Sequence, residues 1–395
     1  MLKQGWRWFG PRDPVPLDTV RQAGASEIVT ALHDVPIGQA WTRAQVAERK
    51  ALIETTPAGR TQLRWSVVES IPVPDDVKRL GAGAKASIEA WIASLEAVAA
   101  EGIGVVCYNF MPVVDWTRTD LDWPLPTGAT ALRFEQDRFA AFDLFVLKRP
   151  GAEADYDEAG IARAKSVADG LSEDEADALS RTIAAGLPGG TTDALDLAAF
   201  RDRLAAYGGI DAQRLRAHLI DFLAIVAPVA ERLGVRLTLH PDDPPRPLFG
   251  LPRVASTEAD YAVLFAAVPN AANGMCFCTG SLGVRPDNDL AGIATRFGER
   301  IHFAHLRATK RDRDGLSFHE ADHLDGDVDM VGVMRALVAA NAGRPEERRI
   351  VFRPDHGHRM LDDLTKPGNP GYTAIGRLKG LAELRGVMRA VEQGA

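Results

Sequence analysis

The sequence predicts an α/β protein, a closed (β/α)8 TIM barrel. Eight short apolar runs, each ending in polar residues, recur along the whole chain, and helix-like segments lie between most of them. Strands that alternate with helices imply a parallel sheet, and a count of eight that uses both ends of the chain favours a closed barrel over an open sheet. No Gly-rich G-x-G-x-x-G turn in the sequence supports a dinucleotide-binding fold.

The expected strands follow one another in chain order. They are WRWFG at 6–10, EIVTALHD at 27–34, RWSVVES at 64–70, GVVCYNF at 104–110, VRLTLHPDD from 235, GMCFCTGS from 274, RIHFAHLR from 300 and IVFRPDHGH from 350. The connecting segments show helical periodicity, as at 17–24, 42–54, 87–102 and 212–234. We therefore expect residues 1–395 to form a single barrel domain.

The spacing of the strands breaks once, between the fourth and the fifth. An acidic, Ala-rich stretch at 151–187 predicts several amphipathic helices there rather than a linker. We expect a helical insertion at about residues 115–210, at the mouth of the barrel. Two interpretations stay open, because the insertion could be a solvated surface extension or could cover the site.

The composition and net charge of the chain limit the classes of molecule that it is expected to bind. The chain has 395 residues, of which 46% are hydrophobic and 25% charged, as is usual for a soluble globular protein. Its three cysteines form no disulfide framework and its first residues lack a secretory apolar run, so we predict a cytoplasmic location. A net charge of −8 and the lack of a long apolar run argue against nucleic acid and membrane as partners. A small molecule is the expected partner.

Residues that bind metals end four consecutive strands. The fifth to eighth strands end in His240, Cys278, His305 and Asp355, and in a barrel of this kind the functional groups sit at the carboxyl ends of strands. A lone histidine at such a position is more often a hydrogen-bonded structural residue. Four ligand types at four successive strand ends instead predict a site for a divalent transition metal.

The alternation of side chains along a strand separates ligands from their neighbours. Cys276 points into the barrel one layer below Cys278, so we interpret it as packing, as we do Cys107. His302 faces the helices and His218 lies within a helix, and we interpret both as structural.

A thiolate, a carboxylate and two neutral imidazoles cancel the charge of a divalent ion, so an anionic substrate needs further cations nearby. Arg118 is available, and an arginine can bind a carboxylate in bidentate fashion, although each one could instead pair with a barrel acid such as Glu69. The candidate substrate contacts are Arg285, Arg307, Arg353, Asn109, His319 and His323. Two further groups could move protons: His356, directly after Asp355, and Tyr372, in a Gly- and Pro-rich loop.

Residues 319–329 read HEADHLDGDVD, close to a pattern with which zinc peptidases hold their metal on a helix. The preceding run, ATKRDRDGLSF, is highly charged, contains a glycine and has no helical apolar pattern. We therefore reject the peptidase interpretation and expect His319 and His323 in a loop after the seventh strand, where they either contact substrate or order the loop.

Several long segments resemble the mannonate dehydratase family of hexuronate breakdown. They are WRWFGPRDPV, YNFMPVVDWTRTDL, LKRPGAEADY, HPDDPPRPLFGLPR, CTGSLGVRPDND, FHEADHLDGDVDM, RPDHGHRMLDD and NPGYTAIGRLKGLAELRG. The resemblance implies a barrel similar to xylose isomerase and dehydration of D-mannonate to 2-keto-3-deoxy-D-gluconate with Mn2+ or Fe2+. It implies His240, Cys278, His305 and Asp355 as ligands and His356 and Tyr372 as acid and base, without deciding which is which.

Two alternatives to a dehydratase are a metal-dependent sugar isomerase or epimerase on the same barrel, and a barrel that binds a sugar acid without turnover. Only dehydration yields a 2-keto-3-deoxy acid, so identifying the product distinguishes a dehydratase from an isomerase or epimerase. The family likeness and the size of the barrel suggest a homo-oligomer, a dimer or a tetramer.

Overall fold

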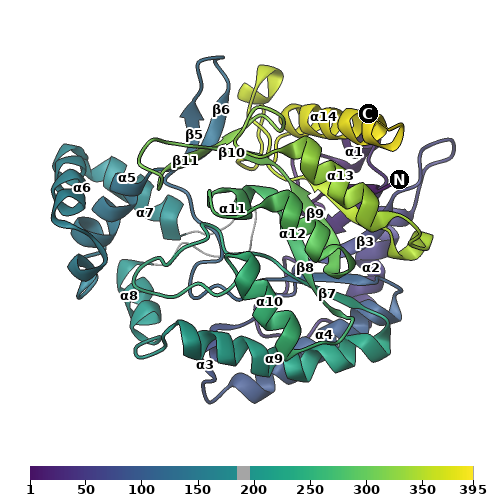
Figure 1. Cartoon of the computed structure of the whole chain (residues 1–395), viewed down its shortest axis with the longest axis horizontal. Coiled ribbons are helices and arrows are strands. Elements are labelled where there is room, and N and C mark those ends of the chain that lie inside the picture. The colour runs from purple at the N-terminus through teal and green to yellow at the C-terminus, as the bar shows by residue number, and fades with distance from the viewer. Residues whose placement is uncertain (185–195, 395) are drawn as a thin grey trace.

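Eight parallel strands close into a barrel in the computed structural model, which describes residues 1–184 and 196–394 (Figure 1). Around the barrel, each predicted apolar run contributes one strand, and the first and last strands pair to close it. The barrel strands are β1 (Lys3–Arg7), β2 (Glu27–Thr30), β3 (Arg64–Glu69), β4 (Val105–Tyr108), β7 (Arg236–Leu239), β8 (Asn273–Cys278), β9 (Ile301–Leu306) and β12 (Val351–Pro354). The predicted (β/α)8 barrel is confirmed.

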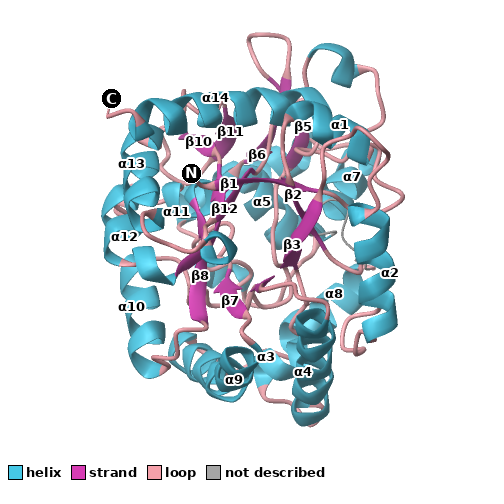
Figure 2. Ribbon diagram, turned by 90° about the vertical axis from the view of Figure 1, so that its right-hand side faces the viewer, coloured by secondary structure: helices cyan, strands magenta, loops and turns pink. Residues whose placement is uncertain are grey.

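Helices surround the strands on the outside (Figure 2). The helices that connect the barrel strands are α1 (Leu17–Ala23), α2 (Arg43–Glu54), α3 (Asp75–Arg79), α4 (Ala84–Ala100), α9 (Ala212–Leu233), α10 (Glu258–Ala267), α11 (Thr279–Gly283), α12 (Leu290–Arg296), α13 (Met330–Asn341) and α14 (Ala374–Glu392). Short 3-10 turns are η3 (Gly298–Arg300), η4 (Glu346–Arg348) and η5 (Leu361–Leu364). No helix in the described part of the chain is long and apolar enough to cross a membrane.

The interior of the barrel is closed below the site by a small apolar cluster. It contains the predicted packing residues Cys107 and Cys276, with Val29, Val67, Val105, Phe303 and Val351. Because side chains fill the lower barrel, polar groups that point inward can meet a ligand only at the carboxyl ends of the strands. His302 lies outside this cluster, with its Nε2 3.3 Å from the Ala271 carbonyl oxygen, and His218 Nδ1 lies 2.8 Å from the Lys78 carbonyl oxygen.

The segment between β4 and β7 is more than the helical insertion that the sequence predicts. It holds α5 (Gln136–Ala141), the π-helical turn η1 (Phe142–Val146), the 3-10 turn η2 (Ala152–Asp155), α6 (Glu158–Gly170), α7 (Glu173–Ala184) and α8 (Leu197–Ala205). It also holds two strands that were not predicted, β5 (Asp120–Pro124) and β6 (Thr130–Phe134). The helical prediction was therefore incomplete. β5 and β6 pair with each other, and β6 takes a second partner from elsewhere in the chain.

That partner is the segment after the seventh barrel strand. It forms β10 (Ala308–Arg311) and β11 (Phe318–Ala321), which join β6 and β5 in a four-stranded antiparallel sheet of order β10-β11-β6-β5. The HEADH motif begins on β11, not on a helix, so the rejection of the peptidase arrangement is confirmed. The expectation of a loop was wrong for residues 318–321, because pairing with β6 makes them a strand.

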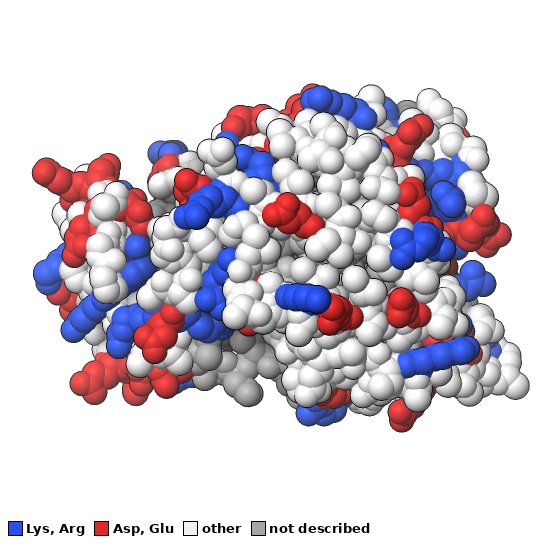
Figure 3. Space-filling view, turned by 90° about the horizontal axis from the view of Figure 1, so that it is seen from below, with Lys and Arg blue, Asp and Glu red and all other residues white. Residues whose placement is uncertain are grey.

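On the face seen in Figure 3, acidic and basic side chains lie interspersed over the surface. A mixed pattern of this kind suits a solvated face, since binding to a phosphate backbone requires cations gathered on one side.

Candidate metal and proton-transfer site

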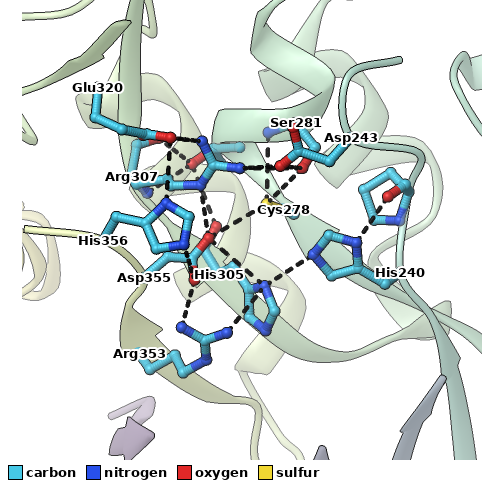
Figure 4. A network of polar contacts seen from close by, with 12 residues as sticks. His240, Asp243, Cys278, Ser281, His305, Arg307, Glu320, Arg353, Asp355 and His356 are labelled. Atoms are coloured by element: carbon cyan, nitrogen blue, oxygen red, sulfur yellow. Dashed lines mark hydrogen bonds and ion pairs between the residues drawn. The ribbon is translucent and has the colours of Figure 1, made fainter. Parts of the chain in front are cut away.

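Three side chains of types that can bind a metal gather at the carboxyl ends of adjacent barrel strands (Figure 4). His240 directly follows β7, Cys278 ends β8, and His305 lies on β9. One ligand atom from each lies within 4.8 Å of the others, and His240 Nε2 is 3.1 Å from His305 Nδ1. Ligands at about 2.0–2.3 Å from one ion lie at most about 4.6 Å apart, so the Nε2–Nδ1 spacing fits two ligands of one metal.

Asp355, after β12, lies against the same group. Its Oδ2 is 3.7 Å from Cys278 Sγ and 3.8 Å from His305 Nδ1. The carboxylate also accepts hydrogen bonds from Arg307 Nε, at 2.6 Å, and from Arg353. These two arginines fix the orientation of the carboxylate and hold the pKa of Asp355 well below its usual range against the opposing effect of burial.

Outer contacts orient each of these candidate ligands. His240 Nδ1 lies 2.7 Å from the Pro241 carbonyl oxygen, which leaves Nε2 free to face the site. His305 Nε2 lies 3.4 Å from Glu69 Oε2, so its Nδ1 faces inward. Cys278 Sγ accepts a hydrogen bond from the Ser281 backbone N–H at 3.4 Å and lies 3.2 Å from Ser281 Oγ. These two contacts fix the position of the sulfur.

His356 and Tyr372 form a buried hydrogen-bonded pair next to this group. His356 Nε2 lies 3.1 Å from Tyr372 Oη, and His356 Nδ1 lies 3.1 Å from Glu320 Oε1. A carboxylate accepts only, so Nδ1 carries the proton and Nε2 is the acceptor toward the tyrosine hydroxyl. Burial lowers the pKa of His356, although Asp355 and Glu320 oppose it, and burial raises the pKa of Tyr372 to about 12.

A fully buried ion network supports both groups. Arg307 donates to Asp243, at 2.5 Å, and to Glu320, at 2.7 Å, and Arg118 bridges the same two carboxylates at 2.7 and 2.8 Å. The network contains four arginines and four carboxylates, which are Arg7, Arg118, Arg307, Arg353, Glu69, Asp243, Glu320 and Asp355. Its charges balance, as burial requires.

The site opens on a cavity with about 470 Å³ of space, which we call the inner cavity. Of the predicted substrate contacts, Asn109, Arg307 and Arg353 line it, together with the proposed acid and base. Arg285, His319 and His323 do not line it.

Local contacts account for the three that lie elsewhere. Arg285 pairs with Asp287 at the surface, with Nη2 2.5 Å from Oδ2. His319 packs on Trp123, with ring centroids 4.7 Å apart, and His323 is buried against α14 near Gly380.

Sequence reasoning missed several members of the network. Asp243 lies in the HPDD run directly after β7. This position at a strand end is the one feature of the sequence that could have identified it. Glu320 lies inside the HEADH motif but was not singled out, because the sheet that carries it was not predicted. Gly280 was also missed, although an added Cβ there would lie 2.4 Å from the Arg307 side chain, so glycine is what allows Arg307 its position.

Replacing Arg118 with methionine is expected to destabilise the fold by about 3–5 kcal/mol, because two buried carboxylates would lose one of their two cations. Arg118 is 0% exposed and also packs over the Trp116 ring at 4.7 Å. Chemical denaturation of the purified variant measures the change. Arg285→Met is the matched control, since its exposed ion pair is worth about 0–1 kcal/mol. Equal effects from the two substitutions would contradict the structural role of the network.

The fold defines a class, the (β/α)8 TIM barrels. A protein of that description from Mycobacterium smegmatis, solved in complex with magnesium, is similar in fold, with a TM-score of 0.52 and 14% identity over 98% of each chain. At this identity the likeness concerns the fold alone.

The family follows from closer relatives. The family model for D-mannonate dehydratase (UxuA) matches residues 2–395. The mannonate dehydratase of Brucella canis is 62% identical, covering 99% of this chain and 98% of that protein, and the one of Chromohalobacter salexigens is 56% identical over 99% of each. The crystal structure of mannonate dehydratase from Streptococcus suis serotype 2 is 33% identical with a TM-score of 0.76, covering 99% of this chain and 94% of that one. The chain belongs to the mannonate dehydratase family of metal-dependent hydro-lyases. The predicted family is confirmed.

Proposed function

We propose that this protein dehydrates D-mannonate to 2-keto-3-deoxy-D-gluconate and water in hexuronate catabolism. The observation that carries the proposal is the hydrogen-bonded pair of His356 and Tyr372, which lies beside the His–Cys–His group in a chain 62% identical to a mannonate dehydratase. Elimination of water from adjacent carbons needs one base and one acid within hydrogen-bond reach, and this pair supplies both.

The donor set of His240, Cys278, His305 and Asp355 fits a divalent transition metal. Imidazole, thiolate and carboxylate donors together suit Mn2+, Fe2+, Co2+ or Zn2+, and we propose Mn2+ or Fe2+. When bound there, the ion would supply a Lewis acid for the charge that develops on the substrate oxygens during proton removal. The choice between the two metals stays a prediction.

Charge also favours an acidic substrate. The eight buried charges of the network balance on their own, so a divalent ion held with one further thiolate would leave the site with one net positive charge. A single carboxylate matches that charge. Arg307 and Arg353 already pair with carboxylates, at 2.7 Å to Glu320 and 2.8 Å to Glu69. We therefore assign Arg307 and Arg353 the role of orienting Asp355. Neither of them is assigned to bind the substrate carboxylate on its own.

We assign His356 as the base and Tyr372 as the acid. Neutral His356 presents an unprotonated Nε2 that can accept the C2 proton, while Tyr372, whose pKa is about 12, keeps its proton and can give it to the departing C3 hydroxyl. The C2–H and C3–O bonds break, water leaves, and the enol that forms becomes the 2-keto-3-deoxy acid. The 3.1 Å contact between Nε2 and Oη lets the proton return to the tyrosine and resets the pair.

The first experiment measures metal-dependent product. The protein is stripped with chelator, reloaded anaerobically with Mn2+ or Fe2+, and given D-mannonate, and the 2-keto-3-deoxy acid is followed. We expect product only after reloading. An epimerised or isomerised sugar in its place would support the isomerase alternative, and saturable binding without any product would support a binding barrel. Sedimentation of the same sample tests the predicted homo-oligomer.

A further inference from the structure

A second cavity lies beside the inner cavity and shares a wall with it. This outer cavity has about 1220 Å³ of space, open to solvent, and Arg7, Glu69, Ser70, Asn109 and Asp115 line both cavities. Its other walls come from the segments that follow β2 and β3 and from α8 of the insertion. A molecule bound at the metal group can therefore extend past this shared wall into the outer cavity.

The insertion closes one side of the outer cavity. Arg203 on α8 lines it and donates to Asp75 Oδ2 at 3.0 Å and to the Val113 carbonyl oxygen at 2.9 Å. Tyr207, just beyond α8, donates to Asp75 Oδ1 at 2.8 Å. Of the two interpretations of the insertion, these contacts favour one in which it helps to enclose the region next to the site.

His33 is the unusual residue of the outer cavity. It lies three residues after β2, and both of its ring nitrogens are buried without a hydrogen-bond partner among the residues that the structure describes. Leaving a buried polar atom unpaired costs about 1–3 kcal/mol, so such atoms are normally satisfied by a partner. Burial lowers the pKa of His33 to about 3, with Arg7 and Arg49 acting in the same direction. The ring is therefore neutral and offers one donor and one acceptor, as a hydroxyl group does.

The position of His33 suits a group at the far end of the substrate. The Phe9 ring contacts both His33, with centroids 5.6 Å apart, and Tyr372, with centroids 4.9 Å apart. One aromatic ring thus separates His33 from the proposed acid. Around it, the shared wall offers Ser70, Asn109 and Asp115, which are hydrogen-bonding groups suited to a chain of hydroxyls.

We propose that the outer cavity holds the far end of the sugar acid and that His33 binds a hydroxyl beyond C4, so that His33 sets the preference for a six-carbon acid. The proposal rests on the proposed function and makes His33 a specificity-determining residue that takes no part in proton transfer. It predicts that His33 matters only for substrates long enough to reach it.

The test compares two substrates across variants. They are D-mannonate and a four-carbon aldonate with the same configuration at C2 and C3, which lacks the far hydroxyls. For His33→Phe we expect kcat/KM on mannonate to fall by about tenfold, the worth of a hydrogen bond to a buried polar group, mostly through KM. The value for the four-carbon acid should not change. If that acid is not turned over, its inhibition constant against mannonate serves as the measure.

Two further variants separate specificity from folding. His33→Asn keeps a donor and an acceptor and should restore part of the preference for mannonate. His302→Phe is the matched control, because its Nδ1 is also buried without a hydrogen-bond partner in the described part of the chain, but the residue lies on the helix side of the barrel. The preference of His302→Phe for mannonate over the four-carbon acid should equal that of the wild type. The melting temperature of His33→Phe should be no lower than that of the wild type, since two unpaired buried nitrogens are removed.

The outcomes distinguish the two proposals. Suppose that the wild type forms product from mannonate, and that His33→Phe lowers kcat/KM for both substrates equally or for neither. The role of His33 is then overturned and the dehydratase proposal stands. If the metal-loaded wild type forms no product from mannonate, the dehydratase proposal fails, and the assignment of His33 fails with it.

Discussion

Replacing Cys278 with serine is expected to lower metal affinity and turnover together, by at least about 100-fold, since even substitutions of groups around a metal ligand cost 10–100-fold. Cys278 Sγ lies 3.7 Å from Asp355 Oδ2 and belongs to the His240–Cys278–His305 group. A neutral hydroxyl would replace the thiolate and remove the one negative charge that the arginine network does not balance. Metal analysis after dialysis and the mannonate assay measure the two effects.

Cys276→Ser is the matched control on the same strand. Cys276 lies two residues earlier, in the apolar cluster that fills the lower barrel, so it shares the chemistry of Cys278 but not its surroundings. We expect this variant to lose stability by about 1–3 kcal/mol because a hydroxyl replaces a buried thiol, and to keep its metal. Full metal retention by Cys278→Ser would remove this residue from the ligand set.

Removing the Tyr372 hydroxyl is expected to reduce kcat by about 10²–10⁴-fold, the usual contribution of a positioned acid or base. In Tyr372→Phe the ring keeps its edge contact with Phe9, and Arg7, Arg353 and Arg377 remain around it. Metal content should therefore equal that of the wild type. His356→Ala should lower kcat by a similar factor, and combining the two substitutions should add little, because the pair acts as a unit.

Tyr108→Phe controls for the loss of a buried tyrosine hydroxyl. Its ring packs between Trp91 and Phe222 on the helix side of β4, and its hydroxyl has no partner among the described residues. We expect its turnover to match the wild type. Unchanged kcat in Tyr372→Phe, with metal bound, would exclude this hydroxyl as the acid and leave His356 to be tested alone.

Much of the barrel could be predicted from local patterns. A buried parallel strand must be apolar and short, and a connecting helix must carry a 3.6-residue period, so both leave a mark within a few residues. The rule that functional groups lie at the carboxyl ends of barrel strands then placed His240, Cys278, His305 and Asp355 near one another. The structure brings His240, Cys278 and His305 within 4.8 Å of one another, and Asp355 lies against Cys278 and His305.

The second sheet shows where local patterns stop. β6 pairs with β11, where Phe318 lies opposite Phe134, although the two residues lie far apart in the sequence. Each segment pairs with its neighbour in a hairpin, β5 with β6 and β10 with β11. An isolated hairpin is at most marginally stable, so neither could be recognised alone. This pairing positions Glu320 against His356 Nδ1, and with it the orientation of the proposed base.

The sequence by itself therefore determined the fold class, the family and the residues that could bind a metal or move a proton, because these depend on residue type and spacing. Only the tertiary structure decided which charges meet. Arg307 and Arg353 line the inner cavity, and each also pairs with buried carboxylates. Arg285, His319 and His323 looked near the site but lie elsewhere. Which side chains reach the site depends on how segments far apart in the sequence come together in space. In a buried site, the nearest opposite charge then determines which partner each charged side chain binds.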